Sequence, residues 1–179
     1  MPLTSTAITQ TTRESAPKAL LAEWLGSWFD GGPHAVGTDP AKDFPQATIA
    51  FDVGPVGNDA SQPLDGVEIR VIAAGAGRSQ RKWNAEETGK TVFEDVAYVF
   101  TIRAGAPVVG KRNQLADQTA ELLGAVLRNP VSAAPLSAKG IGKVRPGAAQ
   151  TMSAGDLALR MIYCRMRFTY LVGWDEGAG

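Results

Sequence analysis

The chain has 179 residues, of which 44% are hydrophobic and 20% charged, an ordinary composition for a soluble globular protein. A chain of this length forms one domain and buries about 70% of its unfolded surface, so it needs no disulfide to fold. Eighteen basic residues balance eighteen acidic ones. This balance excludes the basic excess typical of an obligate nucleic-acid or anionic-membrane binder. Neither a membrane-spanning run nor a signal-peptide pattern is present, so we expect a protein made in the cytoplasm without a membrane partner.

The N-terminal part predicts an arm followed by a helix. Residues 1–15 have no apolar period, so we expect a flexible arm ahead of a single domain over residues 16–179. Ser15 followed by Pro17 is a helix-start signal, and Gly31 lies in the turn that ends the helix. The apolar residues between them recur at helical spacing and share one stripe. That stripe contains Leu20, Leu21, Trp24, Leu25, Trp28 and Phe29.

Four segments alternate apolar and polar residues, which predicts strands with one buried face. They cover residues 49–53, 67–71, 91–103 and 156–172. The last two are the longest, and each has a clearly apolar face. The apolar faces of these two strands hold Val96, Tyr98, Phe100 and Ile102, and Ile162, Cys164, Met166, Phe168 and Tyr170.

Three segments rich in glycine, proline and small residues predict extended loops. They are residues 34–45, 54–66 and 131–152, and a strand over 141–144 is the alternative for part of the third.

A second helix is expected over residues 111–128, where Asn129 and Pro130 end it. The strands therefore form a group with one helix early and one late, without alternation of strand and helix. This order predicts an α+β fold, a mostly antiparallel sheet with two helices packed on one face.

Residue types that carry catalysis are sparse. The one histidine, His34, lies in a loop without a nucleophile motif, and the one cysteine, Cys164, lies on an apolar strand face. Acidic residues show no calcium-loop spacing, and a single His and Cys cannot form an ordinary zinc site. The glycines of 75–77 and 140–142 lack the spacing of a nucleotide-binding loop. We therefore expect no catalytic residue, metal or cofactor.

Basic residues beside aromatic ones mark a candidate partner interface, because Arg and Trp are enriched among binding hot spots. One cluster, over residues 78–83, precedes the strand 91–103; its alternative interpretation is a solvated hairpin tip. The arginines of the last strand, Arg160 among them, either face water or pair with acidic residues of a neighbouring subunit. The candidate interface residues are Arg78, Arg81, Lys82, Trp83, Arg165 and Arg167.

The part of the chain from about Gly77 to Val172 resembles a known family in the order of its elements. A turn leads into a strand, a Gly/Pro break, a helix that begins Arg-Asn-Gln-Leu-Ala-Asp at residue 112, and a closing strand over 159–172 with alternating arginines. With the helix over 20–29, this plan resembles the tail terminator (tail completion) proteins of long-tailed bacteriophages. The resemblance lies in pattern and spacing rather than in signature residues.

This resemblance implies a virion structural protein rather than an enzyme. Such proteins form rings, typically hexamers, that bind the last ring of tail tube protein, stop its polymerisation and join the tail to the neck or connector protein. Genome DNA can pass through such a ring, without sequence-specific recognition of nucleic acid. The resemblance also implies assembly in the host cytoplasm and a place at the tail–neck junction of the virion.

Other functions stay open. One is a small α+β enzyme with carboxylates gathered from separate loops. Another is a nucleic-acid-binding sheet with Trp83, Tyr98 and Tyr163 as stacking platforms, against which the balanced charge counts. A different neck or tube component of a phage would share the same features.

Overall fold

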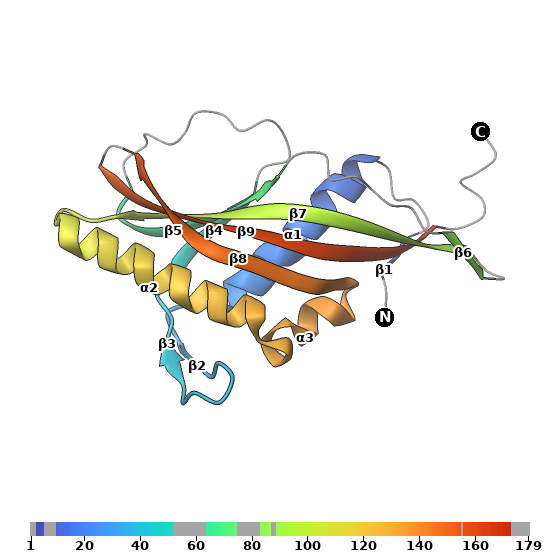
Figure 1. Ribbon diagram of the computed structural model, residues 1–179, viewed down its shortest axis with the longest axis horizontal. Coiled ribbons are helices and arrows are strands. Elements are labelled where there is room, and N and C mark those ends of the chain that lie inside the picture. Colours follow the sequence, from blue (N-terminus) through green and yellow to red (C-terminus); the bar gives the residue numbers. More distant parts are fainter. Residues whose placement is uncertain are drawn as a thin grey trace.

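The computed structural model describes residues 3–5, 10–51, 64–74, 83–86, 89–154 and 156–172 (Figure 1). Its helices are α1 (Gln10–Trp28), α2 (Val109–Arg128) and α3 (Pro130–Ala138). Its strands are β1 (Leu3–Ser5), β2 (Pro33–His34), β3 (Lys42–Asp43), β4 (Ala47–Phe51), β5 (Gly66–Ala73), β6 (Trp83–Glu86), β7 (Gly89–Gly105), β8 (Ile141–Ala154) and β9 (Leu157–Val172).

One seven-stranded sheet is built around the long strands β7 and β9. These two pair antiparallel in one unbroken register, from Lys90 opposite Val172 to Ala104 opposite Ala158. The strands β5 and then β4 extend the sheet beside β7, and β8 lies beside β9. At the far end β6 pairs with the start of β7, and β1 pairs with the end of β9. Only the β1–β9 and β4–β5 pairs are parallel, so the prediction of a mostly antiparallel α+β fold is confirmed.

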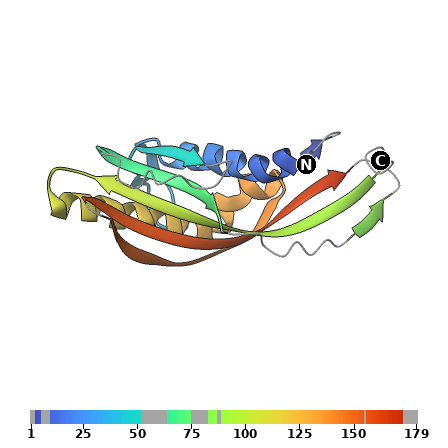
Figure 2. The same cartoon turned by 90° about the horizontal axis from the view of Figure 1, so that it is seen from above.

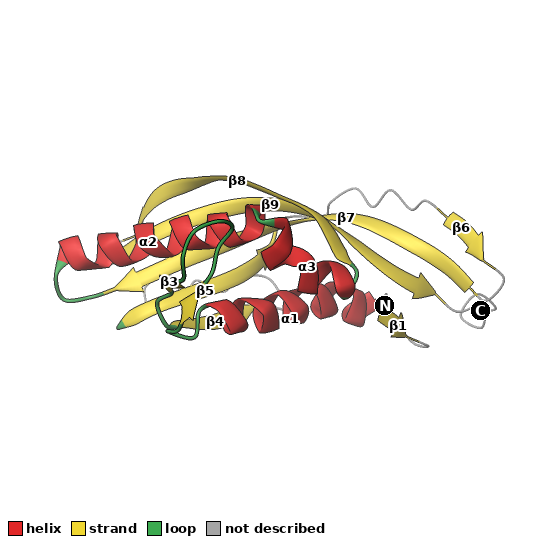
Figure 3. Cartoon of the chain, turned by 90° about the horizontal axis from the view of Figure 1, so that it is seen from below, coloured by secondary structure: helices red, strands yellow, loops and turns green. Residues whose placement is uncertain are grey.

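All three described helices lie on one face of the sheet (Figure 3). The apolar stripes of the two predicted helices are buried there against the apolar faces predicted for the strands. Tyr98, Phe100 and Ile102 of β7 are 4% exposed or less, because every second residue of a strand points to the same face. A large part of the core therefore follows from sequence periodicity. Its largest fully buried side chains include Leu21, Leu25, Phe29, Phe100, Ile102, Leu123, Leu127 and Phe168.

The N-terminal arm is shorter than predicted. Leu3–Ser5 forms β1, and α1 begins at Gln10 rather than near Ser15. Pro17 consequently lies inside the helix and not in its first turn. A proline interrupts one backbone hydrogen bond of a helix, and Pro17 is buried within α1.

The segment 131–152, predicted as an extended loop, is instead α3 and most of β8. The Asn129 side chain accepts a hydrogen bond from the Val131 amide (2.9 Å), and Pro130 occupies the first turn, so a new helix starts at once. Gly140 then turns the chain with φ +89°, and a Cβ there would lie 2.5 Å from the Thr169 carbonyl oxygen. Two register shifts in β8 break its alternation, which is why the strand is hard to recognise from sequence.

The predicted loop 34–45 contains a small ribbon in which His34 pairs with Lys42. Val36 and Phe44 are buried and anchor this ribbon on the helical side of the sheet. Most of the predicted loop 54–66 lies outside the described residues.

Phe100 tests this account of the core, because it is fully buried in the middle of β7. We expect Phe100→Ala to lower the free energy of unfolding by about 3–5 kcal/mol, since it removes apolar contacts and leaves a cavity. The matched control is Phe51→Ala, at a side chain that is 37% exposed on β4, with an expected loss of about 1 kcal/mol or less. Urea unfolding followed by circular dichroism measures both, and equal losses would contradict the assigned core.

Candidate functional site

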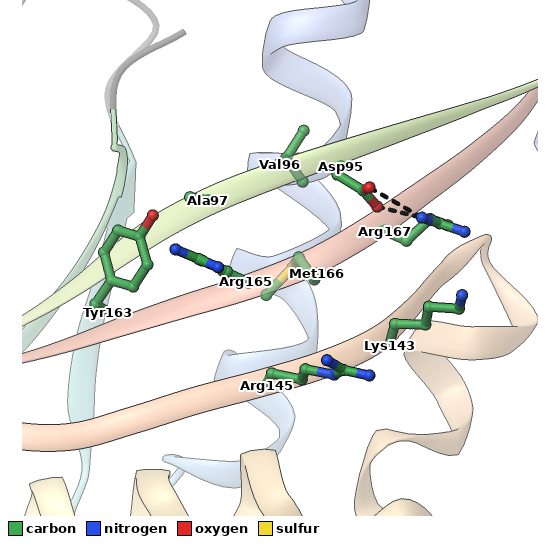
Figure 4. A pocket seen from close by; sticks show the side chains of 9 residues that line it. All are labelled: Asp95, Val96, Ala97, Lys143, Arg145, Tyr163, Arg165, Met166 and Arg167. Atoms are coloured by element: carbon green, nitrogen blue, oxygen red, sulfur yellow. Dashed lines mark hydrogen bonds and ion pairs between the residues drawn. The ribbon is translucent and has the colours of Figure 1, made fainter. Parts of the chain in front are cut away.

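The face of the sheet opposite the helices carries the candidate site. Among the described parts of the chain, no helix lies on this open face (Figure 3). A half-open groove of about 580 Å³ crosses it over β7, β8 and β9 (Figure 4). Four cationic side chains and one carboxylate line the groove, together with one tyrosine. These residues are Asp95, Lys143, Arg145, Tyr163, Arg165 and Arg167.

Strand periodicity and the pairing of β8 with β9 bring the four cations together. Arg165 and Arg167 are two residues apart on β9 and so share the open face. On β8, Arg145 pairs with Arg165 and Gly142 with Arg167, so the chain between them contains an extra residue. Lys143 lies in this bulge with φ 52°, a left-handed backbone conformation that residues other than glycine rarely adopt. Lys143 and Arg145 are two residues apart on β8, and both line the groove.

Only one of the four cations has a carboxylate partner in the groove. Arg167 donates to Asp95 in a forked pair, with Nε to Oδ1 at 2.7 Å and a terminal nitrogen to Oδ2 at 2.9 Å. This hydrogen bonding raises the pKa of Arg167 despite a small opposing effect of burial. Within the described part of the chain, no acidic group forms an ion pair with Lys143, Arg145 or Arg165. The groove therefore keeps an excess of positive charge.

Aromatic rings lie beside the guanidinium groups. The Arg165 guanidinium carbon is 5.9 Å from the centre of the Tyr163 ring, and that of Arg167 is 6.0 Å from the centre of the Phe93 ring. Tyr163 is 41% exposed. Such contacts hold a guanidinium group in place while leaving its hydrogen-bond donors available to a ligand.

Three further cations of the sheet, Arg70, Arg103 and Arg160, are paired within the fold. Arg70 and Arg103 both donate to Glu68 Oε1, at 2.6 and 2.8 Å. Burial raises the pKa of Glu68, but the hydrogen bonds from these arginines outweigh it and hold the pKa below its usual value. Arg160 lies 2.6 Å from Asp117 of α2 and is 7% exposed, so the prediction that it faces water or a neighbouring subunit is wrong.

The predicted interface residues therefore fall into two groups, those that lie in the described structure and those that lie outside it. Arg165 and Arg167 lie in the groove. The backbone of Trp83 belongs to β6, opposite Val92. Arg78, Arg81 and Lys82 lie outside the described residues.

Two groove residues, Lys143 and Arg145, were missed as interface candidates because their segment was interpreted as a loop. Their spacing of two is a strand signal, but Pro146 and the small residues around it obscure that signal. Of the predicted stacking residues, Tyr163 is exposed, whereas Tyr98 is buried under the helices and cannot stack on a base.

His34 and Cys164 both have structural surroundings. His34 Nε2 lies 2.9 Å from Asp30, and its ring packs edge-on against Phe44. Cys164 is fully buried, and burial raises the pKa of its thiol to about 12, so it stays protonated at neutral pH.

The described residues contain no cluster of three or more His, Cys, Asp or Glu side chains placed to hold a metal ion. None of α1, α2 and α3, the helices in the described part of the chain, has the length and hydropathy needed to cross a bilayer. Comparisons of the sequence with protein-family models and with curated proteins find no match.

The Glu68 network predicts how stability depends on pH. Because the pKa of Glu68 is lower in the folded state, its contribution is complete above the unfolded value near 4.5 and is lost as pH falls through the folded value. We expect Glu68→Gln to cost about 1–3 kcal/mol at pH 7 and progressively less below pH 4.5. Urea unfolding across pH measures this difference.

Asp39→Asn is the control, since Asp39 forms an exposed pair with Lys42. We expect it to have little effect at any pH. A cost for Glu68→Gln that does not change with pH would contradict a charged Glu68.

Proposed function

We propose that this protein is a ring-forming assembly subunit that caps the tail tube of a bacteriophage. In this proposal a homo-oligomeric ring, of about six subunits, binds the last ring of tube protein, ends polymerisation and offers its other side to the neck or connector. The proposal rests on the resemblance in element order to tail terminator proteins and on one feature of the fold, the long β7–β9 ribbon.

The β7–β9 ribbon continues past the ends of the helices (Figure 2). At 17 and 16 residues, β7 and β9 are about three times as long as an average strand. Beyond the helical layer, β6 and β1 are the strands that pair with them. A ribbon of this kind is only marginally stable in water by itself, because little apolar surface is covered. Contact with a neighbouring subunit or with the tube would cover it.

The sheet also has edges at which another chain can pair. The described strand β4 has five residues, and among the described strands it pairs with β5 alone. On its other side, Ala47 at its start donates to the Phe29 carbonyl. Ring closure needs a heterologous contact, in which one surface of a subunit meets a different surface of the next. A projecting ribbon and a distant strand edge are two such different surfaces, and strand addition at an edge is a common binding mode.

A carboxylate-based enzyme is not the proposal that these features favour. The open face of the sheet carries a cationic groove whose one carboxylate is held by Arg167. A carboxylate fixed in a forked ion pair is a poor general base, because the pair stabilises its ionised form.

The ring is tested by the mass of the purified untagged protein, measured by native mass spectrometry and compared with negative-stain images. We expect closed rings of about six copies with a central channel. Adding the protein to polymerising tube protein should shorten tubes and leave a ring at one end of each. A monomer that also fails to bind tube ends would overturn the proposal.

The tube contact is tested at the segment that leads into β6. We expect Arg81→Ala with Trp83→Ala to leave the fold intact and to abolish capping, because Arg and Trp contribute strongly at interfaces. The control is Lys111→Ala with Val109→Ala, two exposed positions at the start of α2. Tube lengths measured by electron microscopy report capping. If the Arg81/Trp83 variant caps tubes normally, the contact with the tube lies at another part of the surface.

A further inference from the structure

The net charge of the whole chain does not show that positive charge is concentrated on one face of the sheet. Basic and acidic residues are equal in number over the whole chain. The groove on the open sheet face nevertheless holds four cations and one carboxylate, an excess of three positive charges. Three of the cations, Lys143, Arg145 and Arg165, are exposed. Like charges gathered this closely repel one another, so the arrangement is favourable when an anion lies among them.

The spacing of the cations suits a linear polyanion. The backbone positions of Arg165 and Arg167 are about 6.7 Å apart along β9, and the backbone of Arg145 lies about 5 Å from that of Arg165, across the β8–β9 pairing. Successive phosphates of an extended nucleic-acid strand have a comparable separation. The groove is half open, so a strand can enter and leave at its two ends.

The Lys143 bulge adds a second indication. A non-glycine residue at φ 52° costs free energy, and such strain collects at functional sites. A regular β8 would place one fewer residue between the partners of Arg165 and Arg167. The residue with this strained conformation is thus one that lines the groove.

Tyr163 supplies a platform for a base. It follows the same alternation as Arg165 and Arg167, and it lies in the groove at the end nearest Arg165 (Figure 4). Tyr163 is 41% exposed, and the Arg165 guanidinium lies over its ring. Aromatic rings next to cations are the usual means by which proteins bind single strands without reading their sequence.

We propose that this groove binds an extended single strand of nucleic acid, with Lys143, Arg145 and Arg165 on the phosphates and Tyr163 stacked on a base. An acidic protein segment is the competing occupant, since carboxylates also pair with guanidinium groups. The exposed tyrosine favours nucleic acid, because a carboxylate chain has no flat group to stack on it. This binding does not require ring assembly, so it can fail or succeed independently of the tail-capping role.

The test is fluorescence anisotropy of a labelled oligothymidylate of about 12 nucleotides, titrated with the full-length protein at about 50 mM salt. We expect saturable binding whose logarithmic dependence on salt has a slope of about −2, for about three phosphate contacts. Arg145→Glu should weaken binding at least tenfold. Tyr163→Ala should weaken it at least fivefold, whereas Tyr163→Phe should keep nearly full affinity.

Lys111→Glu is the matched control, because it makes the same change in net charge at an exposed position of α2. It should change affinity by less than twofold. Labelled polyglutamate of equal charge distinguishes the two occupants, and we expect it to bind at least tenfold more weakly than the oligonucleotide. Equal binding of polyglutamate, equal effects of Arg145→Glu and Lys111→Glu, or no saturable binding of the oligonucleotide would each overturn the proposal.

Discussion

The antiparallel pairing of β7 with β9 is the constraint on which the rest of the structure depends. Side chains of a strand alternate between faces, so this register decides what is core and what is surface. A slip of β9 by one residue along β7 would move Ile162 to the open face and bring Arg165 under the helices. Burial of that apolar face therefore fixes the register. The cationic groove is its consequence on the other side of the same strands.

Sequence alone predicted the parts of the fold that have regular periods. The helical stripe around Leu21 and the alternating face around Phe100 were identified because burial repeats every 3.6 or 2 residues. The extended loop predicted over residues 131–152 was wrong, and two register shifts in β8 remove the period that would have shown the strand. The alternative of a strand over residues 141–144 is confirmed, because these residues belong to β8. The predicted start of α1 was wrong because Pro17 was interpreted as a first-turn signal, whereas it lies inside the helix.

The candidate site was only half predictable for a related reason. Arg165 and Arg167 could be identified from β9 by itself, whereas their partners depend on a pairing that no local pattern reveals. The net charge of zero counted against a cationic surface, because a sum over the chain does not show where charged residues lie in the fold. Arg160 and Arg165 lie on opposite faces of β9. Arg160 therefore pairs with Asp117 within the fold, whereas Arg165 is exposed in the groove.

The parallel pairing of β1 with the end of β9 brings residues near the two ends of the chain into register, with Leu3 opposite Tyr170 and Ser5 opposite Val172. A fusion joined directly before Leu3 and one joined directly after Val172 would therefore begin at the same tip of the molecule. A short linker joining the termini, with new ends opened elsewhere on the surface, would free that tip.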